Sequence, residues 1–201
     1  MKKRLHFSFF LLSLQPNLSQ HMNILHLSDL KLGLPGISPI EGANLEENCM
    51  VALHRSGHDQ TVSLAVDGLE QCTFSLKWED SYDVQTERTY ADEQSVTERA
   101  AVGISVLLAL RMTDYTIIER SRKGTGFDYM LGNKDDSLFA PKARLEVSGI
   151  MKESEHNTVT ARYSAKLAQT DVSDDTCLPA YVSIVEFSTP KALFGIKNKE
   201  V

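Results

Sequence analysis

Two acidic side chains interrupt apolar, strand-like stretches in the second half of the chain. Asp128 lies within KGTGFDYMLG (residues 123–132), and Glu146 lies within ARLEVSGI (residues 143–150). A carboxylate in an otherwise apolar strand needs a physical reason, because burying a charge without a partner costs free energy. Carboxylate oxygens are ligands that hard cations such as Mg²⁺ prefer, so metal binding is the chemistry that these residue types could support.

Each acid also has a purely structural interpretation. Asp128 follows closely after glycines, and aspartates near turns commonly hydrogen-bond the neighbouring backbone. Glu146 could belong to the solvated face of an edge strand, because period-two alternation puts Leu145 and Val147 on one face and Glu146 with Ser148 on the other. The sequence leaves these interpretations open beside the functional one.

A buried helix is expected before these strands. Ser95 and Glu98 have the S-x-x-E pattern of a capping box, in which each side chain satisfies a free amide of the first helical turn. The run AAVGISVLLALRM (residues 100–112) that follows is apolar nearly all round, which is typical of a helix buried on all sides.

Three strands, a second helix and a last strand are expected after residue 112. Residue choice and periodicity predict strands at 115–121, 127–132 and 143–150, a helix at 156–170 and a strand at 180–188. A continued helix is the alternative for the first of these segments, because its apolar run is short. The second half of the chain thus has the order α-β-β-β-α-β.

The first half of the chain is expected to be rich in β-structure. Apolar runs at 49–53 and 61–66 flank the turn-like RSGHDQ, which predicts a hairpin, and alternation over 72–78 predicts a third strand. The polar segment 79–94 is expected to be a loop. The expected fold class is α+β or α/β, divided into an N-terminal extension (1–21), a β-rich part (22–94), a core (95–190) and a C-terminal tail (191–201).

The N-terminal extension has two interpretations. Its basic start, MKKRLH, and short apolar run, FSFFLLSL, imitate a weak secretory signal, but no A-x-A-like cleavage site follows. We expect a loose tail on a cytoplasmic protein, with export as the alternative if residues 1–21 act as a signal peptide. No other stretch is long and apolar enough to span a bilayer, and the three cysteines include no CxxC pair, which favours a reducing compartment.

The charge balance restricts how the protein could bind nucleic acid. The 201 residues include 42% hydrophobic and 24% charged residues, and the net charge is −6. Strong non-specific binding to DNA usually requires a basic protein, so this acidity argues against it. A local basic patch remains compatible with the composition, and Arg120, Arg122 and Lys123 form such a cluster beside Asp128.

The order of elements, with one acid in the second strand and another in the third, resembles the core of the restriction-endonuclease-like PD-(D/E)XK nuclease superfamily. Its small prokaryotic branch of nuclease-like domains has roughly G-x-G-x-D followed by (I/V)-E-V-K. The matching strings are GTGFD, from Gly124 through Gly126 to Asp128, and LEVS, from Leu145 to Ser148. The resemblance covers about residues 95–188, and its motifs are short.

This resemblance implies a fold, a cofactor and a reaction. It implies a restriction-endonuclease-like core in which Asp128, Glu146 and the backbone carbonyl of Val147 bind Mg²⁺ or Mn²⁺, and in which the metal activates water for phosphodiester hydrolysis. Nucleic acid is the implied partner, without a membrane. The residues expected to contact it are Arg122, Lys123, Gly124, Gly126 and Arg162.

The chain departs from the family pattern at one position. Where the family has a catalytic lysine two residues after the glutamate, this chain has Ser148. Lys166, one turn from Arg162 on the following helix and in one polar stripe with Gln169, could stand in for that lysine. Alternatively the domain binds nucleic acid or protein without cutting, or it is an unrelated α+β interaction domain that matches by chance. DNA versus RNA, protein partners and oligomeric state stay open.

Overall fold

An eight-stranded mixed sheet forms the centre of the protein, with its strands in the order β1-β3-β2-β8-β7-β6-β5-β4. The structure is a computed structural model that describes residues 23–136 and 138–197. The expected N-terminal extension, residues 1–21, lies outside the described residues. The strands are β1 (Ile24–His26), β2 (Thr61–Gly68), β3 (Cys72–Lys77), β4 (Tyr115–Arg120), β5 (Tyr129–Asn133), β6 (Ala143–Ile150), β7 (Ala180–Glu186) and β8 (Lys191–Ile196).

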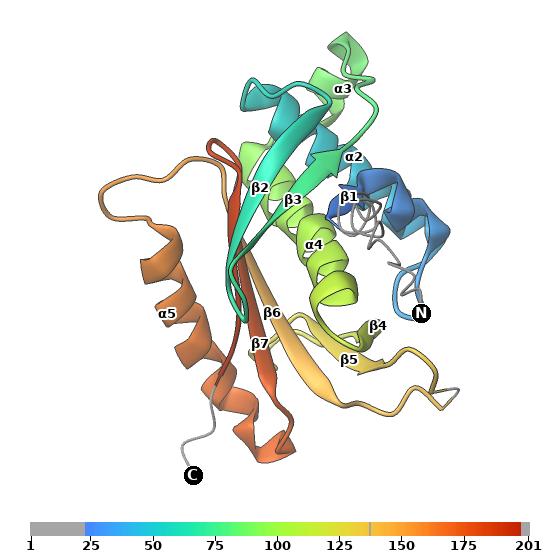
Figure 1. Ribbon diagram of the computed structural model, residues 1–201, viewed down its shortest axis with the longest axis vertical. Coiled ribbons are helices and arrows are strands. Elements are labelled where there is room, and N and C mark those ends of the chain that lie inside the picture. Colours follow the sequence, from blue (N-terminus) through green and yellow to red (C-terminus); the bar gives the residue numbers. More distant parts are fainter. Residues whose placement is uncertain (1–22, 137, 198–201) are drawn as a thin grey trace, which may run out of the picture.

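Helices cover both faces of this sheet, so the expectation of a mixed α/β protein is confirmed. Figure 1 shows α5 on one side of β7 and β8, with α4 and α2 on the other. Within the described residues, no helix has both the length and the apolar character that crossing a bilayer requires. The helices are η1 (Leu27–Leu32), α2 (Pro39–Arg55), α3 (Val84–Thr89), α4 (Glu93–Met112), α5 (Val159–Gln169) and η2 (Thr170–Thr176).

The pairing of the strands follows from their connections. Short connections join β4 to β5 and β5 to β6, and both pairs are antiparallel. β6 and β7 are parallel, because the chain crosses from one to the other through α5 and η2. β8 pairs with β7 in antiparallel fashion and with β2 in parallel fashion, so it joins the two halves of the chain in one sheet.

Helix α4 packs directly on the sheet, as its apolar run predicts. An added Cβ at Gly149 of β6 would lie 2.4 Å from the Thr97 carbonyl oxygen of α4, so only glycine permits this approach. Ser105 of α4 and Ser183 of β7 share a buried hydrogen bond with an Oγ–Oγ distance of 2.6 Å. The predicted capping box is wrong, since the N-cap is Asp92, whose side chain accepts from the Ser95 amide at 3.1 Å.

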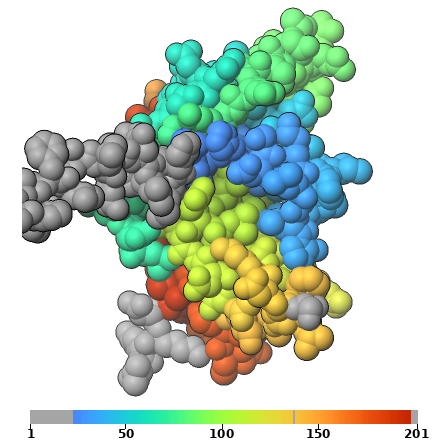
Figure 2. All heavy atoms as spheres, turned by 45° about the vertical axis from the view of Figure 1, so that its right-hand side comes forward, coloured from blue at the N-terminus to red at the C-terminus, as the bar shows by residue number. Residues whose placement is uncertain are grey.

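The predicted strand at residues 49–53 is wrong, because this segment lies inside helix α2. Ser38 caps the helix by accepting from the Glu41 amide, and a proline occupies the first helical position. Leu45, Cys49 and Leu53 are fully buried at a spacing of four residues, which is the helical period. The apolar run 49–53 resembles a strand because the polar residues 46–48 separate it from Leu45, the first buried residue of the helical stripe. Figure 2 shows η1 and α2 lying over α4 on this side of the molecule.

Two further elements were not predicted. Helix α3 lies in the segment expected to be a loop and begins after Asp83, whose side chain accepts from the Thr86 amide at 2.7 Å. Strand β8 lies in the segment expected to be a C-terminal tail, and its Ala192 and Phe194 are buried. The other predicted strands and the second predicted helix overlap observed elements. The strands predicted at 61–66, 72–78, 115–121, 127–132, 143–150 and 180–188 overlap β2, β3, β4, β5, β6 and β7, and the helix predicted at 156–170 contains α5.

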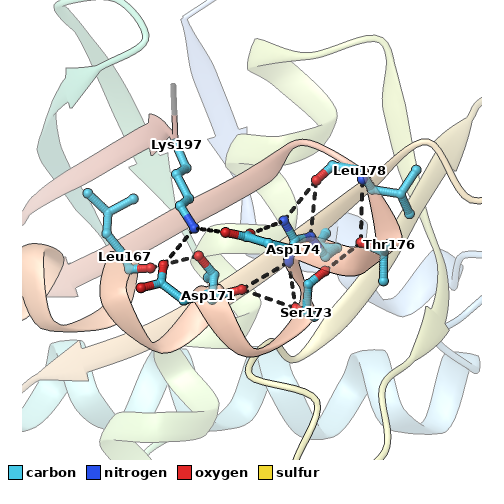
Figure 3. A network of polar contacts seen from close by, with 9 residues as sticks. Leu167, Asp171, Ser173, Asp174, Thr176, Leu178 and Lys197 are labelled. Atoms are coloured by element: carbon cyan, nitrogen blue, oxygen red, sulfur yellow. Dashed lines mark hydrogen bonds and ion pairs between the residues drawn. The ribbon is translucent and has the colours of Figure 1, made fainter. Parts of the chain in front are cut away.

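A polar network fixes η2 against the end of the sheet. Figure 3 shows Lys197, just after β8, reaching Asp171 and Asp174 of η2, with Nζ–Oδ distances of 2.6 and 2.5 Å. Arg144 of β6 donates to the Thr170 carbonyl, the Ser173 hydroxyl, the Asp174 carboxylate and the Leu178 carbonyl. This network holds the segment between α5 and β7 in place.

Candidate functional site

Asp128 and Glu146 lie opposite each other where β5 begins beside β6. Tyr129 pairs with Leu145 in this antiparallel ladder, so continuing the register by one residue puts Asp128 opposite Glu146. The Asp128 amide donates to the Leu145 carbonyl at 2.9 Å, and the Asp128 carboxylate accepts from the Val147 amide at 2.8 Å. Because opposite residues of an antiparallel pair share one face of a sheet, the two carboxylates lie on the same face.

The Glu146 side chain is buried and only partly satisfied. The residue is 1% exposed. Its Oε1 accepts from Lys166 Nζ at 2.6 Å and from Gln169 Nε2 at 2.9 Å. Its Oε2 is buried and has no hydrogen-bond partner in the described part of the chain. The solvated edge-strand interpretation is therefore wrong for Glu146, which lies between the sheet and α5.

The environment of Glu146 opposes its ionisation. Burial and the negative charge of Asp128 raise the pKa of Glu146 to about 7, while the hydrogen bond and the positive charge of Lys166 act in the opposite direction. Two carboxylates this close repel each other when both are ionised, and a bound cation would remove that repulsion.

Lys166 reaches Glu146 from helix α5. Its side chain is 23% exposed and forms an ion pair with Glu146. Its Nζ also donates to Gln169 Oε1 at 2.9 Å, so the Gln169 amide bridges the lysine and the glutamate. The structure thus brings together all three residues predicted to be catalytic, Asp128, Glu146 and Lys166. Sequence reasoning noted Gln169 only as part of a polar stripe and missed its contact with Glu146.

Ser148 binds an arginine of α5. Arg162 Nη1 donates to Ser148 Oγ at 3.2 Å, and Arg162 Nη2 donates to Asn157 Oδ1 at 2.7 Å. Ser148 follows Glu146 by two residues on the same face of β6, so Arg162 and Lys166 approach neighbouring positions of the strand. Asn157 was not singled out from the sequence.

The glycine-rich turn before Asp128 lies against the end of α5. Gly126 has a φ of +77°, and an added Cβ there would lie 2.5 Å from the Gln169 carbonyl oxygen. Gly126 was predicted to contact nucleic acid. It also has a structural role, because only glycine fits between this turn and the end of α5. Arg122, Lys123 and Gly124, which were predicted to contact nucleic acid, are exposed on this turn.

The donor groups suit a hard divalent cation. Mg²⁺ is commonly bound by one or two carboxylates, with waters and substrate oxygens completing its coordination. Asp128 and Glu146 supply two carboxylates, and the unsatisfied Oε2 of Glu146 lacks a polar partner that a cation would provide. In the part of the chain that the structure describes, no group of three or more His, Cys, Asp or Glu side chains could hold a metal.

Comparisons with protein-family models, with curated proteins and with solved structures find no match to this chain. Its function is therefore inferred from its own geometry.

Proposed function

We propose that this protein is a metal-dependent nuclease that hydrolyses phosphodiester bonds of nucleic acid at Asp128, Glu146 and Lys166. The observation that carries the proposal is the convergence of these three side chains from β5, β6 and α5 around a buried carboxylate oxygen without a partner. Buried polar groups are normally satisfied, so an unpartnered oxygen beside a second carboxylate favours a ligand that comes from outside the chain.

The proposal includes a restriction-endonuclease-like core made of α4, β4, β5, β6, α5 and β7. In its support, β4, β5 and β6 form an antiparallel meander, and α5 then crosses to β7, which is parallel to β6. Gly149 of β6 faces α4, whereas Glu146 and Ser148 of the same strand contact α5. The helices therefore lie on opposite faces, and the acids lie on the α5 face.

In this proposal Asp128, Glu146 and the Val147 carbonyl oxygen hold Mg²⁺ or Mn²⁺. The Val147 amide donates to Asp128, and a residue of an antiparallel pair directs its N–H and C=O toward the same neighbour. The Val147 carbonyl is thus directed toward Asp128 as well. When bound, the cation lowers the pKa of a coordinated water and stabilises the charge that develops on the phosphate.

Lys166 and Gln169 act on the nucleophile side of the proposed reaction. The Lys166 ammonium donates to Glu146 Oε1 and Gln169 Oε1 and has one further N–H with which it can orient the attacking water. Gln169 limits where the ammonium can move, because its amide contacts both Lys166 and Glu146. The lysine that the family has on the strand is thereby replaced in function by a lysine from the helix.

The exposed turn beside the site supplies the proposed contacts with the nucleic-acid backbone. Arg122 and Lys123 are exposed there, and Gly124 has open space around it. The net charge of the protein is −6, so attraction to phosphates is restricted to this local patch. Binding should therefore weaken as the salt concentration rises, with a shallow slope because only a few phosphates are neutralised.

Cleavage assays on plasmid DNA, single-stranded DNA and single-stranded RNA test the proposal. Wild-type protein should cut at least one substrate in Mg²⁺ or Mn²⁺ and none in EDTA, and Asp128→Asn should abolish cutting. Arg88→Gln is the matched control, because Arg88 is exposed on α3, far from α5 in Figure 1. Cutting that persists in Asp128→Asn would contradict the proposal. Metal-insensitive binding without any cutting would instead support an inactive binding module of the same fold.

A further inference from the structure

Arg162 is held in place by neutral partners. Its guanidinium donates to the Ser148 hydroxyl at 3.2 Å and to the Asn157 side-chain oxygen at 2.7 Å. Ser148 is buried, and Asn157 lies in the turn that precedes α5. These two contacts reach the guanidinium from β6 and from that turn, so its orientation is fixed before any ligand arrives.

Arg162 differs from three other buried or partly buried cations of the protein. Lys166 pairs with Glu146, Arg144 with Asp174 and Arg99 with Glu41. Arg162 forms no ion pair with any residue that the structure describes. Its positive charge is therefore oriented but not compensated by a carboxylate.

An oriented guanidinium without a carboxylate partner is suited to bind an oxyanion. A guanidinium has five N–H donors in a rigid plane, and the contacts with Ser148 and Asn157 occupy only some of them. The fork geometry of the group matches phosphate, which it binds through parallel hydrogen bonds.

The position of Arg162 relative to Asp128 and Glu146 indicates where a bound phosphate would lie. Arg162 and Lys166 are one turn apart on α5, which is about 6 Å along the helix axis. Lys166 contacts Glu146, and Arg162 contacts Ser148 two residues further along β6. A phosphate bound by Arg162 would thus lie beside the acidic residues, where a cation is needed to offset their repulsion of an anion.

We propose that Arg162 binds a phosphate group of the substrate next to the two carboxylates, and that Ser148 and Asn157 are its positioning residues. This inference rests on the proposed function for its substrate, but it makes a statement about anion binding that cleavage does not test. It also gives Ser148 a role, so the residue that replaces the family lysine is part of the site.

Binding of inorganic phosphate to the full-length protein in EDTA tests this inference. Phosphate should raise the melting temperature of the wild type above that in chloride of equal ionic strength. Arg162→Gln should weaken phosphate binding by roughly tenfold or more, since hydrogen bonds to a charged group are among the stronger ones. Arg88→Gln removes one positive charge from the remote α3 and should bind phosphate as the wild type does.

Two variants separate positioning from a merely structural contact. Ser148→Ala keeps Arg162 but removes one of its acceptors, and should weaken phosphate binding by about threefold to tenfold. Asn157→Asp keeps the acceptor but pairs the guanidinium with a carboxylate, so it should weaken phosphate binding strongly while the melting temperature without phosphate stays the same or rises. If Arg162 only tied α5 to β6, phosphate binding would be equal in all of these proteins.

The outcomes distinguish this inference from the proposed nuclease activity. Phosphate binding that depends on Arg162 in a protein that cuts no nucleic acid would support the inference and count against the nuclease. Metal-dependent cutting together with phosphate binding that Arg162→Gln leaves unchanged would overturn the inference and leave the nuclease intact. Absence of phosphate binding by the wild type would also overturn it.

Discussion

Two buried charges stand two residues apart on the same face of β6, and their surroundings differ. Arg144 donates to four partners, namely the Thr170 and Leu178 carbonyls, Ser173 Oγ and the Asp174 carboxylate. Glu146 has partners on Oε1 alone, and its Oε2 is buried without one among the described residues. The hydrogen bonds of Arg144 therefore all go to groups of the fold itself.

Under the proposed function, this difference separates a charge that stabilises the fold from a charge that binds a ligand. Leaving a buried polar atom without a partner costs free energy, so a fold that depended on Glu146 alone would satisfy both of its oxygens. Glu146 Oε2 lacks a partner among the described residues and lies near the Asp128 carboxylate. We propose that a divalent cation binds between these two groups.

The largest expected effect comes from removing the charge of Glu146. Glu146→Gln keeps the size of the side chain but removes a metal ligand, so we expect cleavage to fall by about 10³-fold, in line with the loss of a group that stabilises transition-state charge. The metal-free variant should be at least as stable as the wild type at pH 8, because it no longer buries an ionisable carboxyl. Steady-state cleavage and urea unfolding check the two expectations. If Glu146→Gln loses stability but cleaves as fast as the wild type, Glu146 has a structural role like that of Arg144.

Removing Arg144 should have the opposite signature. Arg144→Ala removes the hydrogen bonds that the guanidinium donates to the buried Thr170 carbonyl and Ser173 hydroxyl, so we expect the free energy of unfolding to fall by roughly 3 kcal/mol. Urea unfolding measures this loss. At a temperature where the variant remains folded, its affinity for Mn²⁺ should equal that of the wild type. Loss of metal affinity without loss of stability would show that Arg144 belongs to the site.

The pH dependence of stability sharpens the comparison. Burial and the charge of Asp128 raise the pKa of Glu146 from 4.5 to about 7. Because this pKa is raised on folding, the folded state binds the Glu146 proton more tightly than the unfolded state does. The resulting stabilisation of the folded state is fully present below pH 4.5 and is lost as the pH rises through 7. The wild type without metal should therefore lose up to about 3 kcal/mol relative to Glu146→Gln between pH 4.5 and pH 8. Parallel stability curves for the two proteins would contradict this origin of the shift.

Moving the lysine back to the strand tests whether Lys166 replaces it. Lys166→Ala should lose most of the cleavage activity. The double variant Ser148→Lys/Lys166→Ala should cleave at least about tenfold faster than Lys166→Ala, within the range typical of one proton-transfer group. Single-turnover cleavage rates measure the recovery. Ser148→Lys on its own is the control, because it adds the strand lysine while leaving Lys166 in place. Equal rates in Lys166→Ala and the double variant would argue against the replacement.

The smallest effect is expected at the exposed end of the Arg144 network. Lys197 pairs with Asp171 and Asp174, whose side chains are 64% and 50% exposed. Lys197→Ala should therefore lower the free energy of unfolding by no more than about 1 kcal/mol, as is usual for exposed ion pairs. Urea unfolding at low and high salt measures the loss, which salt should reduce further. A loss as large as that of Arg144→Ala would mean that the network acts as one unit.

The sequence identified the elements of the candidate site because strong local signals mark them. Glu146 lies in a segment that alternates with period two, Asp128 follows two glycines, and Lys166 and Gln169 share a helical stripe. Other features required long-range information. The contact of Arg162 with Ser148 joins residues 14 positions apart across the sheet–helix interface. β8 is short, and its strand character depends on pairing with β2, which lies far away in the sequence.

The failure at α2 has a different cause. Cys49 and Leu53 belong to a buried helical stripe that begins at Leu45, but the polar residues 46–48 separate Leu45 from the apolar run 49–53, which alone is typical of a strand. Short apolar runs cannot be assigned by periodicity alone, so the packing of α2 on α4 decided the outcome. The incomplete hydrogen bonding of Glu146 also depends on tertiary packing, and no local pattern encodes it.

Calorimetric titration of the metal-free protein with Mn²⁺ tests the central claim most directly. We predict a saturable binding isotherm for the wild type and for Arg88→Gln, and none for Asp128→Asn or Glu146→Gln at the same concentrations. Equal binding by all four proteins, or no binding by the wild type, would contradict a cation site between Asp128 and Glu146.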